Sequence, residues 1–230
     1  MHPRRWMLLN RKFNSMINET LKTLCDELVI QIDRISSERK SILNRLVDYV
    51  ESERLASRPV QLVYICTHNS RRSHFGQIWS ALAAAYFKID GVQTFSGGTE
   101  ATAFHPNAIA ALRSIGFEIE PMDDSSNPKY KVQFGEGLFS ICFSKVYDDA
   151  VNPKSNFAAI MTCSDAEENC PFIPGVSVRV ATTYDDPKSF DGTDLQDQKY
   201  LERCKQIGLE CLYVFHEVSI RLQQNTTNQF

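Results

Sequence analysis

From Val60 onward, short apolar runs rich in strand-forming residues alternate with stretches of helical periodicity, and this alternation restricts the folds open to the chain. The apolar runs lie at residues 61–65, 93–95, 158–162 and 177–181. The helical stretches lie at residues 75–87, 106–115 and 195–223. Strands that alternate with helices in this way predict an α/β sandwich with a mainly parallel sheet.

The segment before this alternation has a different pattern. Apolar residues recur at intervals of three and four through residues 14–54, which predicts helix, and Ser36 or Ser37 is a candidate N-cap that divides it in two. We therefore expect a helical N-terminal extension over residues 1–57 and a main domain over residues 58–230. The extension is either a helical hairpin that docks on the main domain or the seam of a homodimer.

A second segment also interrupts the alternation. Residues 130–134 and 138–144 predict two strands, and residues 135–137, which contain two glycines, predict the turn between them. This β-hairpin would belong to an insertion at about residues 120–156.

Composition excludes several classes of protein. The 230 residues carry 25 Lys and Arg against 28 Asp and Glu, a net charge of −3, so the chain lacks the basic excess of a dedicated nucleic-acid binder. No apolar run approaches the roughly 18 residues that a membrane span needs, and the N-terminus does not resemble a signal peptide. We therefore expect a cytoplasmic protein without a nucleic-acid or membrane partner, whose seven cysteines are thiols.

The loop after the first predicted strand carries the strongest chemical signal. It begins with Cys66 and ends with Arg72 and Ser73, directly before a predicted helix. Backbone N–H groups that wrap into a helix N-terminus form an anion site, where a cysteine becomes a thiolate more readily and an arginine offers two donors to the anion. The candidate oxyanion-binding residues are Thr67, His68, Asn69, Ser70, Arg71, Arg72 and Ser73. The alternative is that Cys66 fills the core beside an exposed basic loop.

This loop, with its strand and helix, resembles the low-molecular-weight protein tyrosine phosphatase superfamily, which includes the thioredoxin-coupled arsenate reductases. The resemblance covers about residues 61–217 and implies a flavodoxin-like three-layer sandwich with a four-stranded sheet, in which the main domain is catalytic. It also implies that Cys66 is the nucleophile and that Arg72 clamps the oxyanion. Two residues depart from the pattern, since His68 stands where glycine is usual and Arg71 where a second cysteine is common.

A proton donor for the leaving group is the next requirement of such chemistry. Asp185 and Asp186 precede Pro187 after the last predicted strand, where an ordinary turn is the alternative. The superfamily places an aspartate immediately before a proline here, so the resemblance selects Asp186 as general acid.

Two further cysteines, Cys163 and Cys170, follow a predicted strand and enclose a polar segment that we expect to be mobile and at the surface. Without a matching pair of Cys or His nearby in sequence, they do not predict a metal site, and no cofactor is implied. Arsenate reductases carry their two resolving cysteines at this spacing, whereas the phosphatases lack them. The resemblance therefore implies arsenate reduction through a Cys66–Cys163–Cys170 relay, with thioredoxin or a similar reductant as partner. The alternatives are a phosphatase with a phosphocysteine intermediate and a non-catalytic binding module.

Overall fold

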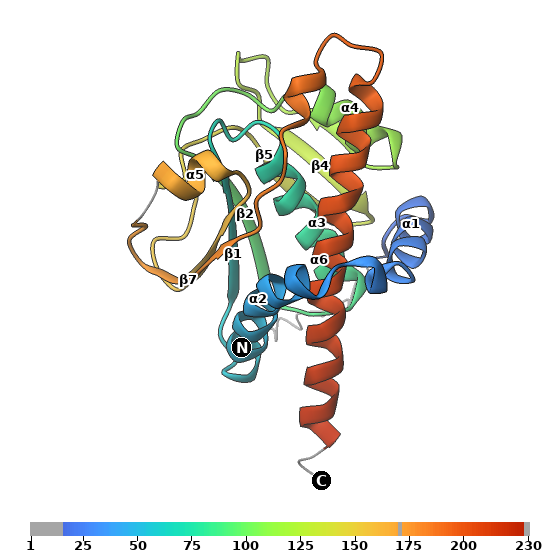
Figure 1. Cartoon of the computed structure of the whole chain (residues 1–230), viewed down its shortest axis with the longest axis vertical. Coiled ribbons are helices and arrows are strands. Elements are labelled where there is room, and N and C mark those ends of the chain that lie inside the picture. Colours follow the sequence, from blue (N-terminus) through green and yellow to red (C-terminus); the bar gives the residue numbers. More distant parts are fainter. Residues whose placement is uncertain (1–15, 170–171, 228–230) are drawn as a thin grey trace, which may run out of the picture.

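The computed structural model describes residues 16–169 and 172–227, and a four-stranded sheet forms its centre (Figure 1). All three strand pairings in this sheet are parallel, in the order β2-β1-β6-β7. The strands are β1 (Val60–Cys66), β2 (Val92–Gly98), β6 (Phe157–Met161) and β7 (Val176–Ala181). The prediction of a parallel α/β sheet is therefore confirmed.

Helices cover both faces of this sheet. The larger core contains Leu62 and Tyr64 of β1 together with apolar residues of α1, α2, α3, α4 and α6. Val63 and Ile65 point to the other face, where they pack with Ala166 of the short helix α5. The helices of the main domain are α3 (Arg72–Tyr86), α4 (Pro106–Ser114), α5 (Ser164–Asn169) and α6 (Gln196–Thr227). Alternate β1 side chains thus enter opposite layers, as a strand buried on both faces requires.

The N-terminal helices join the larger core. They are α1 (Glu19–Val29), the 3-10 turn η1 (Ile32–Arg34) and α2 (Ser37–Leu55). The Ser36 hydroxyl accepts a hydrogen bond from the Arg39 N–H at 3.2 Å, which confirms the predicted N-cap and the division into two helices. Arg39 also forms an ion pair with Glu210 of α6 at 2.8 Å. Because these helices pack within the chain, the docked hairpin is favoured over the homodimer seam.

The predicted hairpin is present and belongs to a second sheet. Strands β4 (Tyr130–Gly135) and β5 (Leu138–Cys142) pair antiparallel, and Gly137 in the turn has φ +70°. A third strand, β3 (Glu118–Pro121), pairs with β4, and the sequence analysis missed it. Four residues that end in proline are too short a run to indicate a strand by their pattern.

In residues 16–169 and 172–227, no helix combines the length and the apolar character that a membrane crossing demands. The division of the chain at residue 57 stays a prediction.

Candidate active site

The loop between β1 and α3 lies at the carboxyl end of the central sheet. Three of its carbonyl oxygens accept hydrogen bonds from segments other than α3: Thr67 from Glu100, His68 from Thr102 and Ser144, and Ser70 from His105. Within the described parts of the chain, the backbone N–H groups of residues 67–72 donate to no protein acceptor. A loop whose carbonyl groups are held outward and whose N–H groups are unpaired can bind an oxyanion.

Asn69 determines the shape of this loop. It is fully buried and has φ +44°, a left-handed conformation that asparagine adopts more readily than most residues. Its Oδ1 accepts from the Lys145 N–H at 2.9 Å, so its Nδ2 donates to Ser73 Oγ at 2.8 Å. His68, which stands at the position where glycine is usual, is not among the residues with positive φ. The left-handed turn therefore falls on a residue that tolerates it.

The same contacts orient the groups around the Cys66 thiol. Ser73 Oγ lies 3.1 Å from Cys66 Sγ, and Cys66 is 4% exposed. A thiolate at Cys66 can only accept, so the Ser73 hydroxyl donates to it while it accepts from Asn69 Nδ2. The loop thus supplies a hydrogen-bond donor to a thiolate at Cys66.

Arg72 connects this loop to the segment that carries the candidate acid. Its Nη1 donates to the Tyr184 carbonyl at 2.6 Å, and its Nη2 contacts Asp186 Oδ2 at 2.6 Å. The other oxygen of Asp186 accepts from the Lys188 N–H at 3.0 Å, at the start of the 3-10 turn η2 (Pro187–Phe190). The predicted clamp and the predicted acid are therefore neighbours, although 114 positions separate them in sequence.

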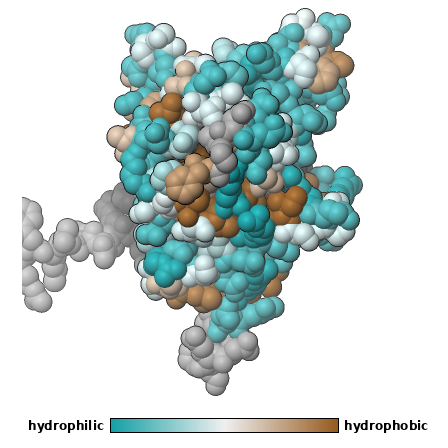
Figure 2. All heavy atoms as spheres, turned by 60° about the vertical axis from the view of Figure 1, so that its left-hand side comes forward, coloured by the Kyte–Doolittle hydropathy of each residue, from teal (hydrophilic) through white to brown (hydrophobic). Residues whose placement is uncertain are grey.

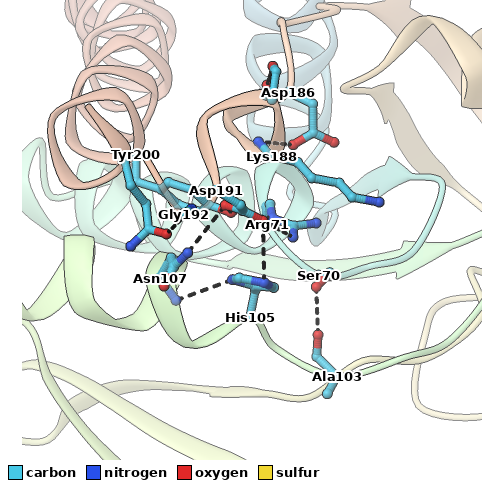
Figure 3. Close-up of polar contacts among 12 residues, drawn as sticks. Ser70, Arg71, Ala103, His105, Asn107, Asp186, Lys188, Asp191, Gly192 and Tyr200 are labelled. Carbon is cyan, nitrogen blue, oxygen red and sulfur yellow. Dashed lines mark hydrogen bonds and ion pairs between the residues drawn. The ribbon is translucent and has the colours of Figure 1, made fainter. Parts of the chain in front are cut away.

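Arg71 faces a different set of partners (Figure 3). Its Nε donates to the Tyr200 hydroxyl at 2.6 Å, and its Nη2 lies 3.3 Å from Asp191 Oδ2. Asp191 also accepts from the Tyr200 hydroxyl at 2.7 Å and from Asn107 Nδ2 at 3.2 Å. Burial and the Asp191 carboxylate raise the pKa of Tyr200 to about 12, so its hydroxyl remains a donor. The Arg71 side chain thus links the loop to α4 and α6.

A second thiol lies beside the loop. Cys163 follows β6 and is 1% exposed, and its Sγ lies 3.4 Å from Thr67 Oγ1. The Ala166 N–H donates to the same sulfur at 3.4 Å. The structure thus brings Cys163 next to the residue that follows Cys66, and both cysteines belong to one apolar cluster.

The segment after Cys163 lies largely at the surface, as expected, and it forms a short helix; its mobility stays a prediction. Residues 164–169 form helix α5, whose Ala166 is buried in the core and whose Glu167 forms an ion pair with Arg179 of β7 at 2.9 Å. One apolar side chain and one ion pair are enough to dock a polar segment as a short helix. Cys170, the other predicted relay residue, lies outside the described residues.

The remaining described cysteines lie in the core, as expected. Burial raises the pKa of each of these thiols to about 12, so they are protonated at neutral pH: Cys25, Cys142, Cys204 and Cys211. No group of three His, Cys, Asp or Glu side chains in residues 16–169 and 172–227 is placed as metal ligands would be.

Several supporting residues were not identified from the sequence. Asp191 and Tyr200 hold Arg71, and the Lys145 N–H fixes Asn69. Each contact spans more than 70 positions, so no local pattern could have indicated it.

Comparisons with known proteins find similar sequences and structures. No protein-family model matches the chain. Arsenate reductase 2 of Staphylococcus epidermidis is 27% identical over 135 residues, which cover 59% of this chain and 84% of that protein. The arsenate reductase of Bacillus subtilis strain 168 is 26% identical over 148 residues, 64% of this chain and 88% of that protein.

Among solved structures, a low molecular weight phosphotyrosine phosphatase from Vibrio cholerae is similar with a TM-score of 0.43 and 14% identity, over 72% of this chain and 98% of that one. The sequence relatives are named as arsenate reductases, which are enzymes, and they confirm the predicted resemblance to that group.

Proposed function

We propose that this protein reduces arsenate to arsenite and that Cys66, Cys163 and Cys170 act in turn. The observation that carries the proposal is the buried Cys163 thiol 3.4 Å from Thr67, the residue next to Cys66. A phosphatase needs one thiol at its oxyanion loop, whereas a thiol relay needs a second within reach. The sequence relatives named as arsenate reductases support the same activity.

In the first step, the Cys66 thiolate attacks arsenic, an S–As bond forms and an As–O bond breaks. The unpaired N–H groups of residues 67–72 and the Arg72 guanidinium hold the arsenate oxygens. Asp186 pairs with Arg72 at 2.6 Å in the free protein. In the proposed step Arg72 turns to the arsenate, and Asp186, after it takes up a proton from solvent, is the donor that allows the oxygen to leave as water. Thr67, His68, Asn69, Ser70, Arg71 and Ser73 complete the loop, with Arg71 tethered to Asp191.

In the second step, the Cys163 thiolate attacks Cys66 Sγ. An S–S bond forms, the S–As bond breaks, and its electron pair stays on arsenic, which becomes arsenite while the two thiols are oxidised to a disulfide. Cys170 then attacks Cys163 Sγ, which releases the Cys66 thiolate and leaves a Cys163–Cys170 disulfide. A dithiol reductant of the thioredoxin class reduces this bond by exchange. For this exchange, α5 must move so that the Cys163 sulfur leaves its buried position.

The surface near the relay suits a protein reductant. The face that carries α5 comes forward in Figure 2, and apolar side chains gather at its centre. Phe172, two positions after Cys170, is 77% exposed. Exposed aromatic side chains are frequent anchors of protein–protein contacts. We assign the catalytic domain to residues 58–230 and the extension to residues 1–57, in a protein of the cytoplasm, where such reductants keep thiols reduced.

Anaerobic single turnover with arsenate, followed by mapping of disulfides by mass spectrometry, tests the relay. The full chain should release one arsenite per protein and acquire one disulfide. Cys163→Ser should release no arsenite, and Cys170→Ala should stop after one turnover with a Cys66–Cys163 disulfide. Cys25→Ser removes an equally buried thiol far from the loop and should reduce arsenate normally. Repeated turnover by Cys170→Ala with thioredoxin would rule out the relay.

The rival function is hydrolysis of a phosphate ester, which the same loop and acid support through a phosphocysteine at Cys66. The observation that favours this function is the Arg72–Asp186 pair. Ester hydrolysis needs the oxyanion clamp and the acid, and it does not need the Cys163 thiol. Hydrolysis of para-nitrophenyl phosphate should be the same in Cys163→Ser and the unmodified chain. If arsenite release is also the same in both, the phosphatase is the better assignment.

A further inference from the structure

A large cavity lies between edge strands of the two sheets, and the Cys66 thiol is not part of its lining. Its volume is about 1330 Å³, and its walls come from α3, β2 and β5. Strand β2 is the edge of the four-stranded sheet and β5 is the edge of the three-stranded sheet. The walls combine polar and apolar side chains, and the apolar ones include Ala81 and Ala85 from α3, Phe95 from β2, and Leu138 from β5. Cys66, Arg72 and Asp186 do not line this cavity.

Two buried polar side chains line the cavity and have few hydrogen-bond partners within the protein. Lys145 and Gln77 are each 4% exposed. The Lys145 ammonium has one long hydrogen bond, to the Phe143 carbonyl at 3.5 Å, and lies 4.5 Å from the centre of the Phe143 ring. Within the described residues, no carboxylate lies within ion-pair distance of Lys145. Burial lowers the pKa of Lys145 to about 8, although the Cys142 thiol and Asp149 oppose this shift.

Gln77 adds a second unsatisfied group. Its Nε2 donates to the Ile141 carbonyl at 3.2 Å, which fixes the orientation of the amide, and its Oε1 is buried without a partner. Buried cations and buried amide oxygens are normally paired, because an unpaired one loses its hydration without compensation. Both groups contact the same short stretch of chain, at Ile141 and at Phe143. Together they indicate one end of the cavity where buried polar groups lack partners.

The charged side chains around the cavity are nearly balanced except at its buried end. Its lining includes four lysines, Lys22, Lys88, Lys129 and Lys145, against two carboxylates, Glu19 and Asp90, and Lys22 also pairs with Asp26 at 3.4 Å. Lys145 is the buried one of these lysines. A cavity with apolar walls and one buried cation matches a molecule with one negative group and an apolar body.

We infer that this cavity binds a small monocarboxylate with an apolar body. The carboxylate accepts a hydrogen bond from the Lys145 ammonium, and the body packs against Ala81, Phe95 and Leu138. A water molecule that donates to both the carboxylate and Gln77 Oε1 satisfies the amide. The backbone of Lys145 connects this site to the Cys66 loop, since the Lys145 N–H donates a hydrogen bond to Asn69 Oδ1.

Calorimetric titration of the full chain with octanoate and with 1-octanol tests this inference, because the two probes share an apolar body and differ in charge. We expect octanoate to bind at least about tenfold more tightly than 1-octanol, as one charge-assisted hydrogen bond in a buried site would give. Lys145→Met keeps the apolar stem and should weaken octanoate binding at least about tenfold. Lys199→Met removes one positive charge from α6, outside the cavity, and should bind octanoate normally.

The comparison of the two probes uses the unmodified chain, so it decides the question even if Lys145→Met does not fold. Equal affinity for octanoate and 1-octanol, or no octanoate binding up to about 5 mM, would overturn the inference. Unchanged octanoate binding by Lys145→Met would also overturn it. None of these outcomes depends on arsenate reduction, so the proposed function and this inference can fail separately.

Discussion

Replacement of Asn69 by alanine separates two contributions of this residue to the loop. Asn69 is fully buried, it has φ +44°, and its side chain pairs the Lys145 N–H and Ser73 Oγ. Alanine leaves both partners unsatisfied, at about 1–3 kcal/mol each, and adds about 1–2 kcal/mol for a left-handed conformation. We therefore expect Asn69→Ala to lower the free energy of unfolding by about 3–8 kcal/mol.

Two further variants distinguish these contributions. Asn69→Gly loses the same hydrogen bonds without the left-handed strain, so it should be about 1 kcal/mol more stable than Asn69→Ala. Asn156 also has positive φ, at +57°, and its side chain is absent from the hydrogen bonds of the described residues, so Asn156→Ala should show only the backbone cost of about 1–2 kcal/mol. Urea unfolding of the three variants and the unmodified chain measures all of these differences.

The reactivity of Cys66 provides an independent measurement. Without the hydrogen bond from Asn69, the Ser73 hydroxyl is held less firmly in position to donate to the sulfur, and alkylation of Cys66 by iodoacetamide at neutral pH should slow by about three- to tenfold. Asn156→Ala should leave this rate unchanged. If Asn69→Ala is no less stable than Asn156→Ala and Cys66 reacts at its normal rate, the role assigned to Asn69 is wrong.

Three other changes test the same structure. Gly98→Ala should lower the free energy of unfolding by about 1–3 kcal/mol, since a Cβ would lie 2.6 Å from the Thr67 carbonyl oxygen and 2.7 Å from the Asn69 nitrogen. Urea unfolding equal to that of the unmodified chain would contradict this close approach of Gly98 to the loop. Arg72→Lys should reduce kcat/KM for arsenate by about 100-fold, since a lysine cannot offer two parallel donors; steady-state kinetics with full activity would exclude the clamp. Burial, with the nearby Lys145, lowers the pKa of His74 from 6.5 to about 3. Between these two pH values the unfolded chain binds a proton at His74 that the folded chain does not bind. This contribution to stability is complete above pH 6.5 and should fall by about 2 kcal/mol between pH 7 and pH 5; urea unfolding of His74→Gln across this range should show a smaller decrease.

Local patterns made much of the fold predictable. The alternation of strands and helices reflects burial on both faces of a parallel sheet, and the Ser36 cap and the hairpin turn at Gly137 depend on neighbours in sequence. Cys66 and Arg72 could be proposed for the same reason, because a single loop contains both. Strand β3 was missed, since its place depends on pairing with β4 rather than on its own residues.

The amino-acid sequence alone therefore determined the α/β class and the contiguous loop from Cys66 to Ser73, because periodicity and loop spacing are properties of neighbouring residues. Only the tertiary structure decided that Arg71 binds Asp191, that Asn69 takes the left-handed turn and that Cys163 lies beside Thr67. Each of these depends on elements that meet after the sheet and its helices have packed, and no local pattern encodes such distances.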